Sequence, residues 1–404
     1  MRPIIDLNLS SLPPELRLIL ACLRASPNDA DAVRIERLSR GTINWESFLA
    51  WVDHHHVAPL VYLNLRRFSR NTIPEGVHSG LRNHFERNAQ GGLALAAELV
   101  RLLHLLKENR IPALVLKGPV LALQLYGNLA WRHAGDIDLL VAPHQVDQAD
   151  RLLRDQGYRR ISPELSPRQQ THFKRLVQQF EYYRTDSQLM IDLHWRLLAN
   201  KFLLPLDFGQ LWSRRQSLII AGYPVPAMSR RDLLLFLSVH GAHHAWYRLF
   251  WLNDLAEVLR QDPETDWSRL MADAAKLGAL RSLAQGVVLA HLLLDAPLPE
   301  LLRAYAVQDR KVLSLVEEAF RYILMQQSHP STLSHVVQEK IQTRILYDLK
   351  LLGDSRYKIE VLTNLLLMPV DWETVRLPDS LFPLYYLLRP LLFVRRYLRG
   401  GQGH

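Results

Sequence analysis

Cysteine is almost absent from this chain, which has one such residue, Cys22, among its 404. A single cysteine cannot form an intramolecular disulfide. Because Cys22 lies in an apolar helical pattern with Leu18, Ile19 and Leu23, we expect a buried structural thiol. No signal peptide is apparent, and we expect a cytoplasmic protein.

Long uninterrupted apolar runs are also missing, so no transmembrane segment is expected. The 48% of hydrophobic and 22% of charged residues are typical of a globular protein, and the length suggests two or three structural units. Acidic residues are fewer than basic ones, which gives a net charge of +9. This excess favours an anionic partner such as a nucleotide, nucleic acid, polysaccharide or lipid surface. The alternative is that the positive charge contributes only to solubility.

The most informative stretch begins with a short apolar strand, Pro112–Leu116, which ends at Lys117-Gly118. Pro119 suits the first position of a helix that runs to Tyr126. A helix N-terminus presents unpaired N–H groups and a positive dipole. Together with the charge of Lys117, this turn predicts a phosphate-binding site.

The next strand carries two aspartates, Asp136 and Asp138. Side chains on a strand alternate between its faces, so both carboxylates point the same way while Ile137 and Leu139 face the opposite side. Two such carboxylates repel each other unless a cation lies between them, and oxygen ligands suit Mg²⁺. The pair therefore predicts a metal site.

Two later runs, Leu176–Thr185 and Gln188–Arg196, read as a β-hairpin around Asp186-Ser187. On its second arm Asp192 and His194 share one face. If this arm lies beside the Asp136 strand, it brings a third carboxylate to the metal site. The alternative is a solvent-facing Asp192 on a surface hairpin.

The Lys-Gly turn, Arg132 and the strand Gly-Asp-Ile-Asp-Leu-Leu-Val that contains Asp136 and Asp138 resemble the polymerase-beta-like nucleotidyltransferases. Within them the chain looks most similar to a bacterial group of uncharacterised nucleotidyltransferases. The likeness extends to the Ile-Asp-Leu-His-Trp run around Asp192 and, more loosely, to residues 240–255.

The resemblance implies transfer of a nucleoside monophosphate from a nucleoside triphosphate (NTP) to an acceptor, with release of pyrophosphate. Asp136, Asp138 and Asp192 would hold two Mg²⁺ ions, with Mn²⁺ as an alternative. The β- and γ-phosphates would be bound by three further residues: Lys117, Gly118 and Arg132. Pro119 departs from relatives that have a small residue there, and it removes one backbone donor from the phosphate site.

The fold expected is α+β, with a small mixed β-sheet nucleotidyltransferase core flanked by N-terminal and large C-terminal helical regions. We place the N-terminal helical region at 1–90, the core at 91–225 and the C-terminal helical region at 226–404. The spacing predicts helices over Pro13–Arg24, from Asn44 to Val52, from Gly91 to Asn109 and from Ser229 onward.

Two groups of histidines invite a metal hypothesis. Successive residues such as His54, His55 and His56 cannot converge on one ion from a helix. His240 and His244 share a helix face, but no acidic residue completes a metalloprotease pattern. We expect the second pair to line the nucleotide or acceptor pocket, or to be histidines satisfied by their neighbours.

The basic aromatic tail, residues 381–398, either packs on the body of the protein or lies on an anionic membrane surface. The acceptor is open: a small molecule, peptide, glycan or RNA. Three other functions remain: a toxin-like or antitoxin-like nucleotidyltransferase acting on tRNA or protein, a catalytically silent interaction module, and a metal-dependent hydrolase.

Overall fold

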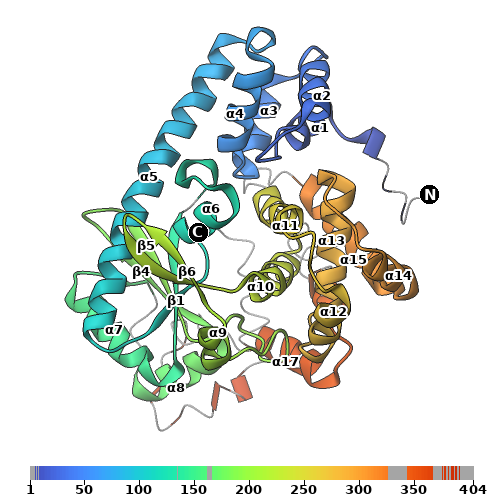
Figure 1. Ribbon diagram of the computed structural model, residues 1–404. Coiled ribbons are helices and arrows are strands. Elements are labelled where there is room, and N and C mark those ends of the chain that lie inside the picture. The colour runs from blue at the N-terminus through green and yellow to red at the C-terminus, as the bar shows by residue number, and fades with distance from the viewer. Residues whose placement is uncertain are drawn as a thin grey trace.

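The computed structural model describes residues 5–161 apart from 6, 8 and 134, then residues 166–325 and 344–366, and scattered positions between 375 and 391. The first part of the chain is helical. Its elements are η1 (Leu9–Ser11), α1 (Pro14–Ala21), α2 (Asp29–Ser39), α3 (Trp45–His54), α4 (Ala58–Phe68), η2 (Arg70–Thr72) and α5 (Glu75–Glu108). The long helix α5 runs from these N-terminal helices down one side of the sheet (Figure 1).

The middle of the chain forms a mixed sheet with intervening helices. In order these are β1 (Ala113–Val115), α6 (Pro119–Tyr126), η3 (Leu129–Trp131), β2 (Asp136–Val141), η4 (Pro143–Gln145), α7 (Val146–Asp155), β3 (Arg159–Arg160), α8 (Pro167–Leu176), β4 (Gln179–Arg184), β5 (Leu189–His194), α9 (Phe208–Ser213), β6 (Gln216–Ile220) and β7 (Tyr223–Ala227). The strand order is β3-β4-β5-β2-β1-β7-β6. Strands β2 and β5 pair in parallel, as do β1 and β7, and the other neighbours are antiparallel.

The last part is again helical. It consists of α10 (Arg230–His243), α11 (Leu249–Gln261), α12 (Trp267–Lys276), α13 (Leu280–Leu294), α14 (Glu300–Gln308), α15 (Arg310–Leu324), a helix over 344–351 and α17 (Ser355–Leu366). Ser229 caps α10, since its side chain accepts a hydrogen bond from the backbone N–H of Asp232. These helices stand beside the sheet and under the N-terminal helices (Figure 1).

Two apolar cores follow from the alternation of side chains on the strands. Ile137, Leu139 and Val141 of β2 pack with α5 and α7 on one face of the sheet. Leu140, on the other face of β2, belongs to a larger core that joins α6, the N-terminal helices and the C-terminal helices. Asp136 and Asp138 share the face of Leu140. The acidic face of β2 is therefore turned toward the C-terminal helices.

The α+β fold with a mixed sheet and flanking helical regions is confirmed. The helix expected from Gly91 begins at Glu75 instead, so the proposed boundary at residue 90 falls inside α5. The helix was predicted from the spacing of apolar residues after Gly91. Gly92, inside α5, allows a close approach, because a Cβ there would lie 3.2 Å from the carbonyl oxygen of Leu129 in η3. The shared core also joins the N-terminal and C-terminal regions.

The hairpin of β6 and β7 has no counterpart among the predicted elements. Its turn is Ala221-Gly222, both with positive φ, and its second strand contains Pro224 and Pro226. Proline argues against a strand because it donates no ladder hydrogen bond.

Most of the basic tail, including Arg389, Arg395, Arg396 and Arg399, lies outside the described residues. Tyr385 is described and buried, and its hydroxyl donates to the carbonyl of Val375.

Candidate active site

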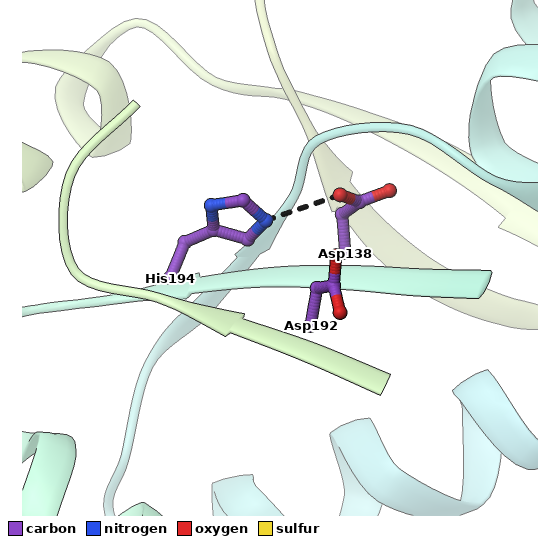
Figure 2. A group of neighbouring side chains, drawn as sticks. All are labelled: Asp138, Asp192 and His194. Atoms are coloured by element: carbon purple, nitrogen blue, oxygen red, sulfur yellow. Dashed lines mark hydrogen bonds and ion pairs between the residues drawn. The ribbon is translucent and has the colours of Figure 1, made fainter. Parts of the chain in front are cut away.

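The predicted acidic residues meet where β2 and β5 pair. The parallel register places Asp138 directly beside Asp192, and Asp136 beside Met190. His194 follows on the same face of β5, and its imidazole approaches Asp138 (Figure 2). Asp138, Asp192 and His194 each offer one ligand atom, and these atoms lie within 4.8 Å of one another. The hairpin prediction and the placement of Asp192 beside the Asp138 strand are confirmed.

Asp138 is fully buried and is the best connected of the three. Its Oδ1 lies 3.0 Å from the Lys117 ammonium and 3.1 Å from His194 Nε2. Burial alone would raise its pKa, but the Lys117 charge and the His194 hydrogen bond outweigh burial, and the pKa falls to about 2. Its Oδ2 is buried without a hydrogen-bond partner in the described structure. A buried, unpartnered carboxylate oxygen is suited to a cation.

Asp192 and Asp136 carry the opposite shift. Burial, followed by the charges of Asp138 and Asp136, raises the pKa of Asp192 to about 8. The charge of Asp138, and then burial, raises the pKa of Asp136. Gln179 Nε2 donates to Asp192 Oδ2 at 2.6 Å and fixes this carboxylate. The acids therefore repel one another in the protein alone, and a divalent cation would relieve that repulsion.

The Lys117-Gly118 turn brings its ammonium to this acidic group. Gly118 has φ +69°, and a Cβ there would lie only 2.6 Å from the backbone oxygen of Asp136, so glycine is required. Burial tends to lower the pKa of Lys117, but the charges of Asp138 and Asp136 raise it overall. Lys117 thus neutralises the acids here, and its contact with phosphates stays a prediction.

Arg132 is paired with a carboxylate, and its contact with phosphates stays a prediction. Its guanidinium forms a bidentate pair with Asp254 of α11, with Nε 2.9 Å from Oδ1 and Nη2 2.8 Å from Oδ2. Its Nη1 donates to the carbonyl of His133, and Tyr126 also donates to Asp254. Arg132 lines the pocket, and its guanidinium also ties the loop before β2 to the C-terminal helices.

A cavity of about 420 Å³ joins the acidic residues to the C-terminal helices. The far wall contains His240, His243 and His244 of α10 and Trp251 of α11, as the sequence led us to expect. Burial lowers the pKa of all three histidines, that of His243 to about 4, so they are neutral at physiological pH. They form no metal-ligand group; in the described chain such a group occurs at Asp138, Asp192 and His194 alone.

The histidine triplet near α3 also has structural roles. His55 Nδ1 accepts a hydrogen bond from the backbone N–H of Leu249 at the start of α11. The His56 ring stacks on His133 with 4.5 Å between centroids. These contacts join α3 to α11 and to the loop before β2.

A larger hollow, of about 610 Å³, lies at the opposite end of β1 beside Lys107, Arg110 and Trp212. No acidic residue lines it, so the group that could hold a metal ion lies in the smaller cavity.

Sequence reasoning placed His194 on the face of Asp192 without giving it a metal-binding role, although its imidazole is one of the three groups here that could hold an ion. The alternation of β5 had placed His194 beside Asp192, which was a usable signal. Arg248 and Asp254 belong to the segment 240–255 that the sequence had linked to the site, but no local pattern shows that Asp254 pairs with Arg132.

Comparisons with known proteins show the family of this chain. A family model described as uncharacterised nucleotidyltransferase matches residues 41–295. A solved structure of an antigenic nucleotidyltransferase-like protein from Paracoccidioides brasiliensis is 15% identical and covers 46% of this chain and 92% of its own, with a TM-score of 0.30. No curated protein matches the chain. Since the family model spans more than half of the sequence, including β2, β5 and α10–α11, the chain belongs to the uncharacterised nucleotidyltransferase family.

Proposed function

We propose that this protein transfers a nucleoside monophosphate from an NTP to an acceptor in a reaction that depends on a divalent cation. The main support is the cluster of Asp138, Asp192 and His194 beside Lys117 in one cavity. This cluster has excess negative charge and a buried carboxylate oxygen without a partner. Both features fit a cation that in turn binds phosphate oxygens.

Asp138 and Asp192 would hold the cation, with His194 or with Asp136, which lies on the same strand face. Mg²⁺, or Mn²⁺ in its place, would polarise the α-phosphate and stabilise the charge that develops during transfer. The number of ions and the choice of metal remain predictions.

The protein's own groups account for positioning and proton removal. An acceptor oxygen forms a bond to the α-phosphorus, and the bond to the pyrophosphate oxygen breaks. The acceptor proton would pass to Asp192, the third acid of the site. Lys117 contacts the β- and γ-phosphates at the turn that Gly118 permits. The walls of the cavity limit access of water.

The acceptor stays open among small molecules, peptides, glycans and RNA. A toxin-like or antitoxin-like enzyme acting on tRNA or protein would use the same site, so acceptor identification decides between these variants. A catalytically silent module is disfavoured, because burial and mutual repulsion make the charged forms of Asp136 and Asp192 unfavourable in the fold unless a cation is bound. Cytoplasmic location and a membrane contact through the tail are predictions as before.

Transfer of label from each α-labelled NTP, with Mg²⁺ or Mn²⁺ and a cell extract as acceptor source, tests the proposal. We expect a labelled acceptor and released pyrophosphate, whereas a hydrolase would label no acceptor. Asp138→Asn should reduce transfer by about 10³-fold or more, because it removes charge where transition-state charge develops. Asp155→Asn, at an exposed position of α7, is the matched control and should transfer normally. Equal turnover of wild type and Asp138→Asn would refute the site.

A further inference from the structure

Three basic side chains line the active-site cavity: Lys117, Arg132 and Arg248. Two of them are engaged by carboxylates, Lys117 by Asp138 and Arg132 by Asp254. Arg248 forms no ion pair within the described parts of the chain. Its charge can therefore meet a ligand without competition from a carboxylate, whereas Lys117 would contact phosphates while paired with Asp138.

The surroundings of Arg248 make an unpaired charge costly. The side chain is half-buried, and its Nε is buried without a hydrogen-bond partner among the described residues. Its guanidinium lies 5.4 Å from the centre of the Tyr247 ring. Burial lowers the pKa of Arg248, and only the charge of exposed Asp53 acts against this shift. A half-buried guanidinium with an unused buried donor is suited to an anion.

The turn that carries Arg248 is strained and firmly held. Ala245 and Trp246, between α10 and α11, have φ values of 48° and 54°, which are uncommon for residues other than glycine. Trp246 is completely buried, and a Cβ at Gly241 would overlap its ring, while one at Gly286 would lie 2.7 Å from it. Strain of this kind persists where the surrounding structure enforces it, and it concentrates at functional sites.

The residue after Arg248 is fixed as well. The backbone N–H of Leu249 donates to His55 Nδ1, which must be neutral to accept. Burial, His54 and the charge of Arg248 lower the pKa of His55 to about 3, so this acceptor is kept at physiological pH. The backbone on both sides of Arg248 is thus held, and the guanidinium is presented to the cavity by a preorganised corner.

From this arrangement we infer that Arg248 binds a phosphate group of the NTP's triphosphate, in the role that the sequence had suggested for Arg132. The inference rests on the proposed nucleotidyl transfer, since it assigns a substrate contact in the same cavity. The planar guanidinium can donate two parallel hydrogen bonds to phosphate oxygens. Arg132 then acts as a positioning residue that holds the two walls of the cavity together.

Calorimetric binding of inorganic triphosphate in the presence of Mg²⁺ tests this assignment. Arg248→Met should weaken binding by about tenfold or more, the usual effect of losing a charge-assisted hydrogen bond. Arg248→Lys keeps the charge but not the fork, so its affinity should lie between those of wild type and Arg248→Met. Arg67→Met, an equal charge change at an exposed position of α4, is the matched control and should bind like wild type.

Melting temperatures separate a binding role from a structural one. Without ligand, Arg248→Met should melt at the wild-type temperature or above it, because an unpaired desolvated charge has been removed, while the rise caused by triphosphate should shrink. Melting several degrees below wild type without ligand would show a structural arginine and overturn the inference. Unchanged triphosphate affinity together with a raised KM for the acceptor would assign Arg248 to the acceptor and overturn it equally.

The label-transfer assay keeps the two proposals distinct. If the wild type transfers label but Arg248→Met binds triphosphate normally, the Arg248 assignment falls and the proposed function stands. If triphosphate binding depends on Arg248 but no NTP gives transfer, the phosphate contact stands and nucleotidyl transfer falls.

Discussion

The cavity has two walls, one built from strands and one from helices. Their comparison explains which parts of the site can be predicted from the sequence. One wall consists of β2 and β5, where Asp138 and Asp192 lie side by side within a run of six residues on each strand. The other wall consists of α10 and α11, where the strained turn presents Arg248 and the histidines. On the strand wall, the direction of each side chain follows from the alternation of residues along a strand. On the helix wall, the position of each side chain follows from contacts between residues far apart in the chain.

The two walls also differ in electrostatics. The acids of the strand wall repel one another, and the pKa of Asp192 rises to about 8. The histidines of the helix wall are neutral through burial, and Arg248 has no partner in the described structure. A metal ion with a triphosphate would satisfy both walls at once, since the cation meets the acids and the phosphates meet Arg248.

The bond between Arg132 and Asp254 joins the two walls, so breaking it should give the largest loss of stability. Asp254 is fully buried and Arg132 nearly so. Asp254→Asn leaves a buried guanidinium without its counter-charge and should lower the free energy of unfolding by about 3–5 kcal/mol, measured by urea denaturation. Transfer activity should fall as well, because the loop before β2 loses its anchor.

A matched surface pair controls for this effect. Glu86→Gln removes the partner of Arg82 on exposed α5 and should leave the urea midpoint unchanged. Replacing both buried partners, with Arg132→Met and Asp254→Leu, should recover much of the lost stability, because no charge is then left unpaired. A midpoint for Asp254→Asn within error of wild type would mean that the walls do not depend on this pair.

The contrast between the walls sets how far sequence reasoning reaches. The strands, the β4–β5 hairpin and the meeting of Asp138 with Asp192 follow from period-two alternation and turn residues. The partner of Arg132 could not be predicted, because Asp254 lies 122 residues away and is brought close only by packing of α11. In the sequence alone, an arginine near a predicted phosphate-binding turn is interpreted as a phosphate ligand, because its pairing with a distant carboxylate is not visible.

Glycines show the same limit. Gly118 was correctly placed at a turn because its neighbours end a strand and begin a helix. Gly241 and Gly286 make space for the Trp246 ring, a tertiary reason that no local pattern reveals. The β6–β7 hairpin was missed because the two prolines of β7 argue against a strand. This strand pairs with β1 through a single residue pair.

Acid should weaken the helix wall through His55, with an effect next in size. Burial, His54 and Arg248 lower its pKa from 6.5 to about 3, so the unfolded chain binds a proton that the folded protein does not. The contribution of neutral His55 to the free energy of unfolding is fully present above pH 6.5, and it is lost as the pH falls toward 3. Each pH unit in this window costs about 1.4 kcal/mol, so the loss at pH 5 is about 2 kcal/mol.

Comparison with His55→Asn separates the pH-dependent stability due to His55 from that due to other titrating groups. Asparagine does not titrate and keeps a side-chain oxygen that can accept from the Leu249 N–H. The difference in unfolding free energy between wild type and variant, followed by urea denaturation from pH 7 to pH 5, should narrow by about 2 kcal/mol. A difference that is constant over this range would show that His55 is not buried in its neutral form.

The last prediction concerns Asp192, and it tests the strand wall. The folded pKa of about 8 exceeds the unfolded value of 3.8, so the contribution of Asp192 to stability is greatest below pH 3.8 and is lost as the pH rises through 8. Asp192→Asn should therefore melt at the wild-type temperature or a few degrees above it in the metal-free protein, and the difference between the two melting temperatures should widen from pH 6 to pH 9.

Mg²⁺ or Mn²⁺ with a non-hydrolysable triphosphate should raise the melting temperature of wild type more than that of the variant, since any ligand of the folded state stabilises it. Asp155→Asn should follow wild type in both measurements. If Asp192→Asn kept the full metal-induced rise, Asp192 would not be a ligand, and Glu181, its partner across the β4–β5 pair, would become the candidate third acid.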